Sequence, residues 1–303
     1  MRDFDPVVAL ATERLSLAGK EPTRLFHGRG HCYEGYEDFT VDWFAPYLLV
    51  SAYGDDVAGP GQLAARLAAA VPAQSGVCLQ VRDGRQTRAE IVCGQVPDRH
   101  VVCERGLNYL VRMTRNQNVG LFLDMAPVRG WLREQAEGKR VLNLFAFTCA
   151  FSVAAIAGGA KLVVNNDMAR RALEWGRENH RLNDHDPKRV RMLPHDLFKS
   201  WRKIRQFGPY DLVIIDPPTN QRGSFTADRD YAQILRRLPE FAAPGAHILA
   251  CLNSPFLNQD FLGEQMSRWC PACRPVASML PSSDFPDRYP DRGLKMSLFR
   301  YSP

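Results

Sequence analysis

The 303-residue sequence predicts a Rossmann-like α/β fold preceded by a smaller α+β domain. From about residue 139 onward, short apolar runs alternate with helical segments, which is typical of a parallel, doubly wound sheet. Several of these runs end in an acidic residue. The first part of the chain instead contains successive strand-like runs with few helices between them. We therefore expect a small domain over residues 1–135 and a Rossmann-like domain over residues 136–303.

The N-terminal region is expected to be a small antiparallel sheet with helices. VVALATERL (7–15) spaces its apolar residues as a helix does, and Pro60-Gly61 opens a second helix, QLAARLAAAV. The strand-like runs around these helices are TRLFHG, YLLVSAYG, GVCLQVRDG and HVVCERGLNYLVRM.

The second region alternates between strands and helices. The predicted strands are VLNLF, KLVVNN, RVRML, DLVIID and AHILACL. The helical segments between them include SVAAIAGG, ARRALEWGRENHRLN and YAQILRRLPEFAA. In such a sheet, ligands bind at the carboxyl ends of the strands near the topological switch point.

Acidic residues follow three of these strands at the edge where a ligand is expected. They are Asp167, Asp196 and Asp216, and the first strand ends in a polar turn. A single acid in this position could be a helix cap. Four such strand ends in register favour a binding edge over capping alone.

The first turn indicates which cofactor this edge would bind. A dinucleotide site needs G-x-G-x-x-G so that the pyrophosphate can contact bare backbone. The turn here, FAFTCAF (145–151), contains no glycine. A ligand without phosphate fits better: its ribose would bind Asp167, its base amine Asp196, and its amino-acid end the first turn. S-adenosylmethionine is such a ligand.

Composition and charge set limits on the class of protein. Apolar residues make up 45% of the chain and charged residues 24%, as in a globular protein, and the net charge of +6 permits nucleic-acid binding. No signal peptide and no run of about 18 apolar residues is visible, and the eight cysteines are scattered. We expect a cytoplasmic protein without a membrane partner. Cys270 and Cys273 have metal spacing, but the sequence lacks a second pair, so no metal is predicted.

Five segments together resemble a known family, the bacterial class I methyltransferases of large-subunit ribosomal RNA. The likeness is greatest to the guanine-N7 half of the bifunctional enzyme and next to the cytosine-C5 enzymes, over roughly residues 20 to 300. The segments are NQNVGLFLDMAPVRGWL (116–132), LNLFAFTCAFSVAAIAGGA (142–160), NDMARRALEWGRENHRLN (166–183), HDLF (195–198) and IIDPPT (214–219).

The resemblance implies a seven-stranded methyltransferase sheet, S-adenosylmethionine as cofactor, and an RNA substrate, with residues 1–135 as a substrate-binding module. By position it implies cofactor-binding roles for Asp124, Asn143, Phe145, Thr148, Asp167, Met168, Asp196 and Asp216. It implies that Asp216, Pro217, Pro218 and Thr219 lie beside the methyl group and the target base. Arg129 would close the site from the linking segment.

The sequence departs from the family pattern at three places. Cys149 and Ala150 stand where the family usually has a glycine, Asn165-Asn166 replaces an apolar strand end, and Ala126 replaces an arginine. These differences leave the cofactor affinity and the RNA target open.

Asp216 is followed by two prolines, and this pair suggests how the site acts. Proline removes a backbone donor and restricts φ, so the chain leaves the strand on a rigid path. Methyl transfer is an in-line displacement, in which alignment is the main task of the catalyst. Thr219 cannot stack on a base as an aromatic residue would. Guanine N7 has a free lone pair and needs no proton removed, so an alignment-only site suits it.

The residue after the fifth strand argues against cytosine-C5 chemistry. Those enzymes add a cysteine to the ring, but Asn253 occupies the matching position. Cys251, two residues earlier, is interpreted as a core residue. We therefore expect transfer without a covalent enzyme–base adduct, with Asn253 as a substrate contact.

The polar segment NQRGSFTADRD (220–230) is expected to be either an ordinary connecting loop or a substrate-facing lid. In the second case Arg222 and Arg229 would contact the substrate. A methyltransferase for a small molecule or a protein, and a non-catalytic relative that binds RNA or a partner, remain alternatives. The oligomeric state stays open.

Overall fold

The computed structural model describes residues 2–54, 58–72, 74–83, 87–115, 118–218, 220–221 and 225–303. The chain forms two compact units. The N-terminal unit comprises residues 1–126 together with a short later segment, residues 282–289, which we call the strap. The C-terminal unit comprises residues 127–281 and 290–303.

The N-terminal unit contains a five-stranded sheet in the order β1-β2-β3-β4-β5. Its strands are β1 (Thr23–His27), β2 (Phe39–Phe44), β3 (Tyr47–Tyr53), β4 (Gly76–Arg82) and β5 (Thr87–Cys93). The predicted antiparallel sheet is corrected here, because β3 and β4 pair in parallel. The helix α2 (Ala58–Ala70) connects these two strands, and a helical crossover returns the chain in the same direction.

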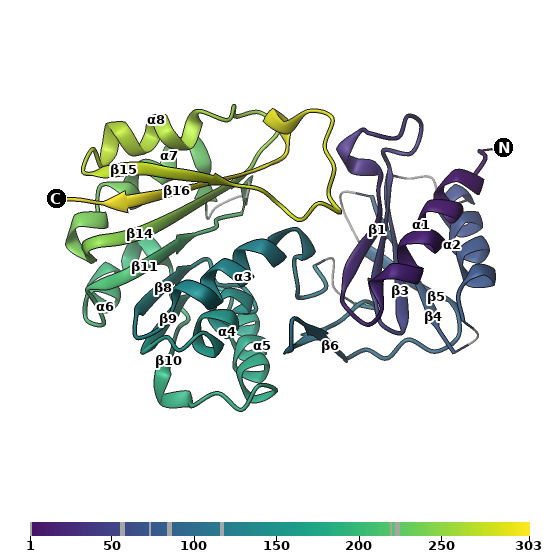
Figure 1. The fold of residues 1–303 in the computed structure, drawn as a ribbon, viewed down its shortest axis with the longest axis horizontal. Coiled ribbons are helices and arrows are strands. Elements are labelled where there is room, and N and C mark those ends of the chain that lie inside the picture. The colour runs from purple at the N-terminus through teal and green to yellow at the C-terminus, as the bar shows by residue number, and fades with distance from the viewer. Residues whose placement is uncertain are drawn as a thin grey trace. The chain divides into compact units, whose positions relative to one another are not determined.

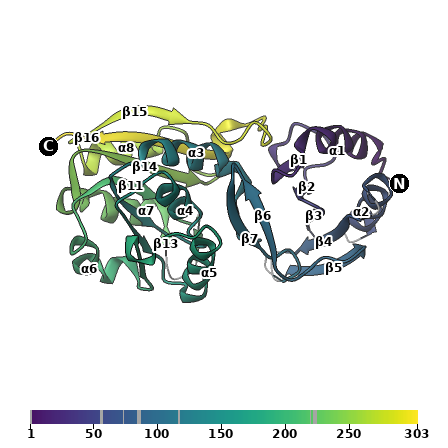
Figure 2. The ribbon, with the colours of Figure 1, turned by 60° about the horizontal axis from the view of Figure 1, so that its bottom comes forward.

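Two helices cover one face of this sheet. α1 (Asp5–Ala18) and α2 contribute apolar residues such as Val7 and Leu63 to a core that also contains alternate residues of the strands, for example Val41 and Val50. Figure 2 shows both helices beside the sheet. Because side chains alternate along a strand, the neighbours of these core residues point to the opposite face.

The run from His100 to Val111 forms a hairpin rather than one strand. It consists of β6 (His100–Glu104) and β7 (Leu107–Val111), paired antiparallel. The turn residues Arg105 and Gly106 have φ values of 50° and 77°. Positive φ at both central residues is what a tight two-residue hairpin turn requires.

The strap packs on β1 and on the turn that follows it. Thr23 Oγ1 donates to Asp284 Oδ2 at 2.6 Å, and the Arg24 guanidinium lies 4.3 Å from the centre of the Phe285 ring. Arg288 N donates to Gly30 O at 2.7 Å. A Cβ on Gly30 would lie 1.8 Å from Pro286 O, so only glycine allows this approach.

The C-terminal unit contains a seven-stranded sheet in the order β10-β9-β8-β11-β14-β16-β15, which confirms the predicted fold class. Neighbouring strands from β10 to β14 are parallel, and β16 is antiparallel to both of its neighbours. The strands are β8 (Arg140–Leu144), β9 (Leu162–Asn166), β10 (Val190–Leu193), β11 (Tyr210–Ile215), β14 (Ala242–Asn253), β15 (Cys273–Met279) and β16 (Leu294–Tyr301). A short β12 (Asn220–Gln221) pairs with β13 (Phe225–Thr226) outside this sheet.

Helices cover both faces of this sheet (Figure 1). One face packs on α6 (Trp201–Arg205), α7 (Ala227–Leu235) and α8 (Phe261–Trp269), whose apolar residues form one core with Leu142, Leu144 and Ile215. The helices on the other face are α3 (Ala126–Gln135), α4 (Ala150–Ala157) and α5 (Arg170–Arg181). Burial on both faces explains why the central strands are almost continuously apolar.

The division between the units differs from the one expected from the sequence. The predicted boundary lay at residue 135, whereas from Pro127 onward α3 belongs to the C-terminal unit and the strap belongs to the N-terminal one. Within the described residues, every helix is too short or too polar to cross a membrane, and no cluster of three or more metal-binding side chains occurs.

Candidate functional site

The strand order places the topological switch point between β8 and β11. The chain proceeds from β8 outward to β9 and β10, then returns to the other side of β8 as β11. Leu144 is in register with Asn166 on one side and with Ile215 on the other. The next residues, Phe145, Asp167 and Asp216, therefore leave the sheet side by side at the carboxyl edge. This is where an open α/β sheet binds its ligand.

The first turn has a backbone that normally requires glycine. Phe145, Phe147 and Cys149 have φ values of 58°, 46° and 63°. Each of these left-handed conformations costs a non-glycine residue about 1–3 kcal/mol, and such strain concentrates at functional sites. The glycine-free sequence thus adopts left-handed backbone that glycine would adopt without strain.

Contacts from several elements hold the turn in this shape. Phe147 N donates to Asp167 Oδ2 at 2.8 Å, Ala146 N donates to Asn166 O at 3.0 Å, and Asn179 Nδ2 donates to Thr148 O at 2.9 Å. On α5, a Cβ at Gly176 would lie 2.4 Å from Cys149 Sγ. The missing side chain of Gly176 therefore lets the turn pack directly against the helix.

Asp167 combines a structural role with spare acceptor capacity. Besides Phe147 N, its carboxylate accepts from Ala169 N at 2.7 Å, and burial raises the pKa of the carboxyl despite these bonds. A carboxylate has about four acceptor positions, so two remain for ribose hydroxyls. The neighbouring Met168 is 55% exposed and offers apolar surface for an adenine ring. These acceptor positions and this apolar surface fit S-adenosylmethionine.

Asp196 is found as a helix cap. Its Oδ1 accepts from Phe198 N at 2.9 Å at the start of the short helix η4 (Leu197–Lys199), and Lys199 Nζ lies 3.5 Å from Oδ2. The contacts of Asp196 are therefore those of a helix cap, which was the alternative to a binding role. An adenine amine would have to share Oδ2 with Lys199.

Asn143 and Thr148 are enclosed by protein. Their side chains are 0% and 1% exposed, so they shape the sheet end from within instead of lining an open surface. Asn143 Nδ2 donates to Asn165 Oδ1 at 2.9 Å, and Asn165 Nδ2 donates to Ser152 Oγ at 2.9 Å.

This buried chain of hydrogen bonds continues into α5. Ser152 Oγ lies 2.9 Å from His180 Nε2, and His180 Nδ1 lies 2.9 Å from His185 Nδ1. A neutral imidazole donates with one ring nitrogen and accepts with the other, so His180 can join Ser152 to His185. Burial, followed by the effect of His185, lowers the pKa of His180 to about 3, so the ring is neutral.

Asp216 stands at the end of β11, between the strand and the buried Pro217. Tyr231 on α7 ties this end to the next strand, since its hydroxyl contacts Ile215 O, at 3.3 Å, and Cys251 O. Burial, with smaller effects of Cys251 and Asp216, raises the pKa of Tyr231 well above its ordinary value. Tyr231 is thus a neutral side chain that joins β11 to β14 next to Asp216, and we call this contact the Tyr231 clamp.

The remaining predicted substrate residues have different surroundings. Asn253 is exposed at the end of β14, whereas Cys251 is fully buried. Arg229 forms a bidentate pair with Asp230, at 2.8 and 2.9 Å, which raises the pKa of Arg229 and lowers that of Asp230. A lid role for Arg229 would require this pair to open. Thr219 and Arg222 lie outside the described residues.

The two residues predicted from the linking segment fall in different units. Asp124 is half-buried in the N-terminal unit, where its carbonyl accepts from Ser282 N at 3.0 Å. Arg129 is buried on α3 in the C-terminal unit, with 3% of its surface exposed.

Sequence reasoning missed the residues that support this edge from behind, namely Ser152, Asn165, Gly176, Asn179, His180 and Tyr231. Polar residues on the apolar side of a predicted helix could have indicated buried hydrogen bonds. Asn179 and His180 in α5 carry that signal, because both are buried.

Comparison with known proteins agrees with this geometry. The model of the S-adenosylmethionine-dependent methyltransferase family matches residues 23–300. Ribosomal RNA large subunit methyltransferase I of Aeromonas hydrophila is 33% identical over 192 residues, which cover 61% of this chain and 48% of that protein. Methyltransferase K/L of a Psychrobacter species is 36% identical over 156 residues, covering 49% of this chain and 19% of that protein. The chain thus spans about half or less of the length of these relatives.

Solved structures support the fold. A Streptococcus mutans protein assigned as a SAM-dependent methyltransferase matches with a TM-score of 0.84 and 23% identity, over 99% of this chain and 82% of its own. At this identity the likeness concerns the architecture of the two units.

Proposed function

Because the chain belongs to the S-adenosylmethionine-dependent methyltransferase family, we propose that it methylates a guanine of large-subunit ribosomal RNA. The observation that carries the proposal is the strained first turn beside Asp167 and Asp216 at the switch point of the sheet. The RNA substrate is supported by the relatives, which are ribosomal RNA large subunit methyltransferases.

Asp167, Met168 and the first turn are the residues that would hold the cofactor. When bound, S-adenosylmethionine supplies a methyl group activated by a sulfonium. Asp167 would accept from the ribose hydroxyls with the acceptor positions that its two amide bonds leave free. The turn contributes a preformed shape, since its left-handed residues are already held by α5 and β9.

Asp216 is proposed to orient the target base. The β11 strand and the Tyr231 clamp restrain its backbone on one side, and Pro217-Pro218 restrains it on the other. A fixed carboxylate can accept from the Watson–Crick edge of guanine while N7 faces the methyl group. In well-oriented systems, such alignment of two reactants lowers the activation barrier by about 7–11 kcal/mol.

A covalent adduct is not part of this proposal. A thiol nucleophile must reach the base, but Cys251 is fully buried and Asn253 occupies the exposed end of β14. A cysteine-independent transfer therefore agrees with the geometry. Adduct formation between the protein and an RNA that contains a fluorinated pyrimidine would overturn this part.

The proposal is tested by incubating the protein with methyl-labelled S-adenosylmethionine and ribosomal RNA from a strain that lacks its gene. Label is expected in one guanine of the large-subunit RNA, found by digestion and nucleoside mapping. RNA from the strain that has the gene should accept none, since the site is already modified. Label in a cytosine, or in a small molecule or protein but not in RNA, would contradict the proposal.

A further inference from the structure

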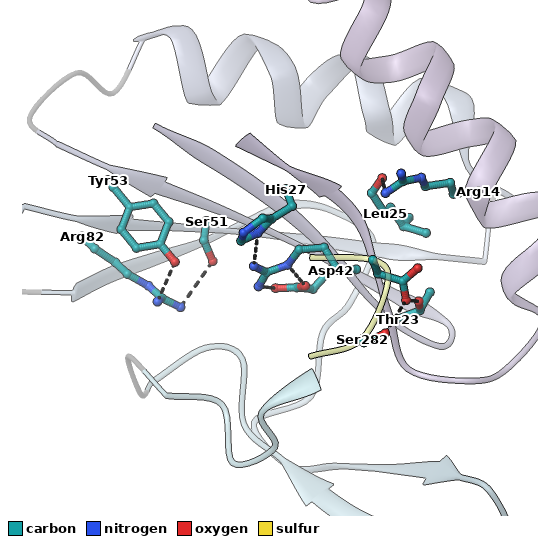
Figure 3. Close-up of polar contacts among 11 residues, drawn as sticks. Arg14, Thr23, Leu25, His27, Asp42, Ser51, Tyr53, Arg82 and Ser282 are labelled. Carbon is teal, nitrogen blue, oxygen red and sulfur yellow. Dashed lines mark hydrogen bonds and ion pairs between the residues drawn. The ribbon is translucent and has the colours of Figure 1, made fainter. Parts of the chain in front are cut away.

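The second face of the N-terminal sheet carries polar residues where the first face carries apolar ones. Asp42, Ser51 and Gln80 point away from the helices. All three are buried, with 5%, 1% and 0% of their surfaces exposed. Figure 3 shows Asp42, Ser51, Tyr53, His27 and Arg82 together on this face. Arg24 of β1 donates to Asp42, Arg82 of β4 donates to Ser51, and Arg29, from the turn after β1, lies over the Tyr53 ring.

One arginine of this face is neutralised. Arg24 forms a bidentate pair with Asp42, at 2.7 and 2.9 Å, and stacks on Phe285 of the strap. Burial acts to lower the pKa of Arg24, but Asp42, with a smaller effect of Asp124, outweighs it and the pKa is raised. Arg24 is thus a structural ion pair within the face.

The other two arginines share one aromatic ring. Arg82 lies 5.2 Å and Arg29 lies 4.2 Å from the centre of the Tyr53 ring. Among the described residues, Arg82 donates to three uncharged oxygens, namely Tyr53 Oη at 3.1 Å, Ser51 Oγ at 3.3 Å and Gln80 Oε1 at 3.0 Å. Within the described part of the chain, no carboxylate pairs with Arg29 or Arg82. Two positive charges therefore remain on this face.

The neighbouring polar groups present donors to the same region. Tyr53 accepts from Arg82 and is only partly buried, so its own hydroxyl proton is available to a ligand. Arg24 Nη1 lies 2.8 Å from His27 Nδ1, which leaves the His27 proton on Nε2. Burial, together with Arg24 and Arg29, lowers the pKa of His27 to about 3, so the ring adds no charge at neutral pH.

The guanidinium groups of Arg29 and Arg82, the Tyr53 hydroxyl and the His27 imidazole are donors that match the chemistry of a phosphate group. We propose that Arg29, Tyr53 and Arg82 form a binding site for the phosphodiester backbone of the RNA substrate. The site lies wholly within the N-terminal unit, and it rests on the proposed function because that function supplies the RNA. Arginines at such a site contribute affinity and register rather than base specificity.

The salt dependence of RNA binding tests this site. Each phosphate contact to a single strand contributes about 0.7 to the slope of log K against log salt concentration. We expect Arg29→Gln to reduce the slope for a fluorescein-labelled single-stranded RNA by about 0.7, and Arg29→Gln with Arg82→Gln by about 1.4. Fluorescence anisotropy over a series of KCl concentrations measures these slopes.

Matched variants separate the site from charge and folding effects. Arg66→Gln removes the same charge on α2, where Arg66 pairs with Asp5, and should leave the slope unchanged. Arg29→Lys keeps the charge and should keep most of the slope. Should Arg82→Gln fail to fold, Arg29→Gln still decides, because Arg29 is exposed.

The outcomes for this site and for the proposed function differ. Wild-type protein that shows no salt-dependent RNA binding would overturn both the RNA substrate and this site. Wild-type binding that Arg29→Gln and the double variant leave unchanged, in affinity and slope, would overturn this site alone. Calorimetry with S-adenosylmethionine should give the same affinity for all folded variants, since the cofactor edge lies in the other unit.

Discussion

The carboxylates at the sheet edge have different hydrogen-bond partners, so their substitution should have different effects on cofactor binding. Asp167 accepts two backbone amides and retains acceptor capacity, whereas Asp196 caps η4. Asp167→Ala should weaken S-adenosylmethionine binding by about 1–3 kcal/mol, because it leaves polar partners unpaired. Titration calorimetry measures the change. Asp186→Ala, which removes a cap from η3 (Pro187–Arg189), is the control and should bind as wild type does.

Asp216 is expected to affect turnover more than binding. Asp216→Asn keeps the shape and removes the charge, so it should fold, bind the cofactor nearly as before, and lose turnover by about 10²-fold, the scale of a misplaced reacting group. Single-turnover methyl transfer measures this loss. Asp211→Asn, at the opposite end of the same strand, should have near-normal turnover. Near-normal turnover of Asp216→Asn itself would show that Asp216 is only a cap.

His180 should make the protein sensitive to acid. Its pKa is about 3 in the folded chain against an ordinary value of 6.5, so below pH 6.5 the unfolded chain binds more protons at this position. Stability from this group is therefore complete above pH 6.5 and is lost as the pH falls toward 3, by up to about 1.4 kcal/mol per pH unit. His180→Gln should show a shallower loss over this range in urea denaturation at several pH values. An unchanged slope would place the acid sensitivity elsewhere.

At the scale of elements, the first turn and α5 depend on each other. Gly176→Ala should destabilise the C-terminal unit by about 1–3 kcal/mol, because its Cβ would lie 2.4 Å from Cys149 Sγ and 2.9 Å from Cys149 Cβ. In a Cys149→Gly background most of this loss should disappear, and glycine also suits the φ of 63° at position 149. A double-mutant cycle from urea denaturation measures the coupling.

The matched control for this cycle is Gly263→Ala on α8, where an added Cβ has no neighbour within 4 Å. It should stabilise the helix by about 0.5–1 kcal/mol. Additive effects of Gly176→Ala and Cys149→Gly would contradict the direct contact between the turn and α5.

At the scale of the whole molecule, the strap belongs to the N-terminal unit although it lies late in the chain. Gly30→Ala should detach the strap, because the added Cβ would lie 1.8 Å from the backbone oxygen of Pro286. We expect faster hydrogen exchange in β1 and earlier proteolysis within residues 282–289. Gly61→Ala on α2 meets no atom within 4 Å and should leave both unchanged. Equal protection in the two variants would show that the strap is not held at Gly30.

Local patterns in the sequence were sufficient to predict much of the C-terminal unit. Alternating strands and helices predicted the Rossmann-like sheet, and the acids after the strands predicted its carboxyl edge. Both were predictable because the spacing of apolar residues and the ends of strands depend on residues that are close in the chain. The same patterns predicted neither β2 nor β5 in the N-terminal unit, nor that α2 makes β3 and β4 parallel.

The features that oppose local backbone preference depend on tertiary contacts. Phe145, Phe147 and Cys149 would avoid left-handed backbone in isolation, and contacts from Asp167, Asn179 and the bare Cα of Gly176 hold them there. The strap and the Arg29–Tyr53–Arg82 cluster likewise join residues far apart in the chain. Local patterns along the chain thus establish which groups reach the sheet edge. Long-range packing decided their conformation, because its energy exceeds the local backbone preference.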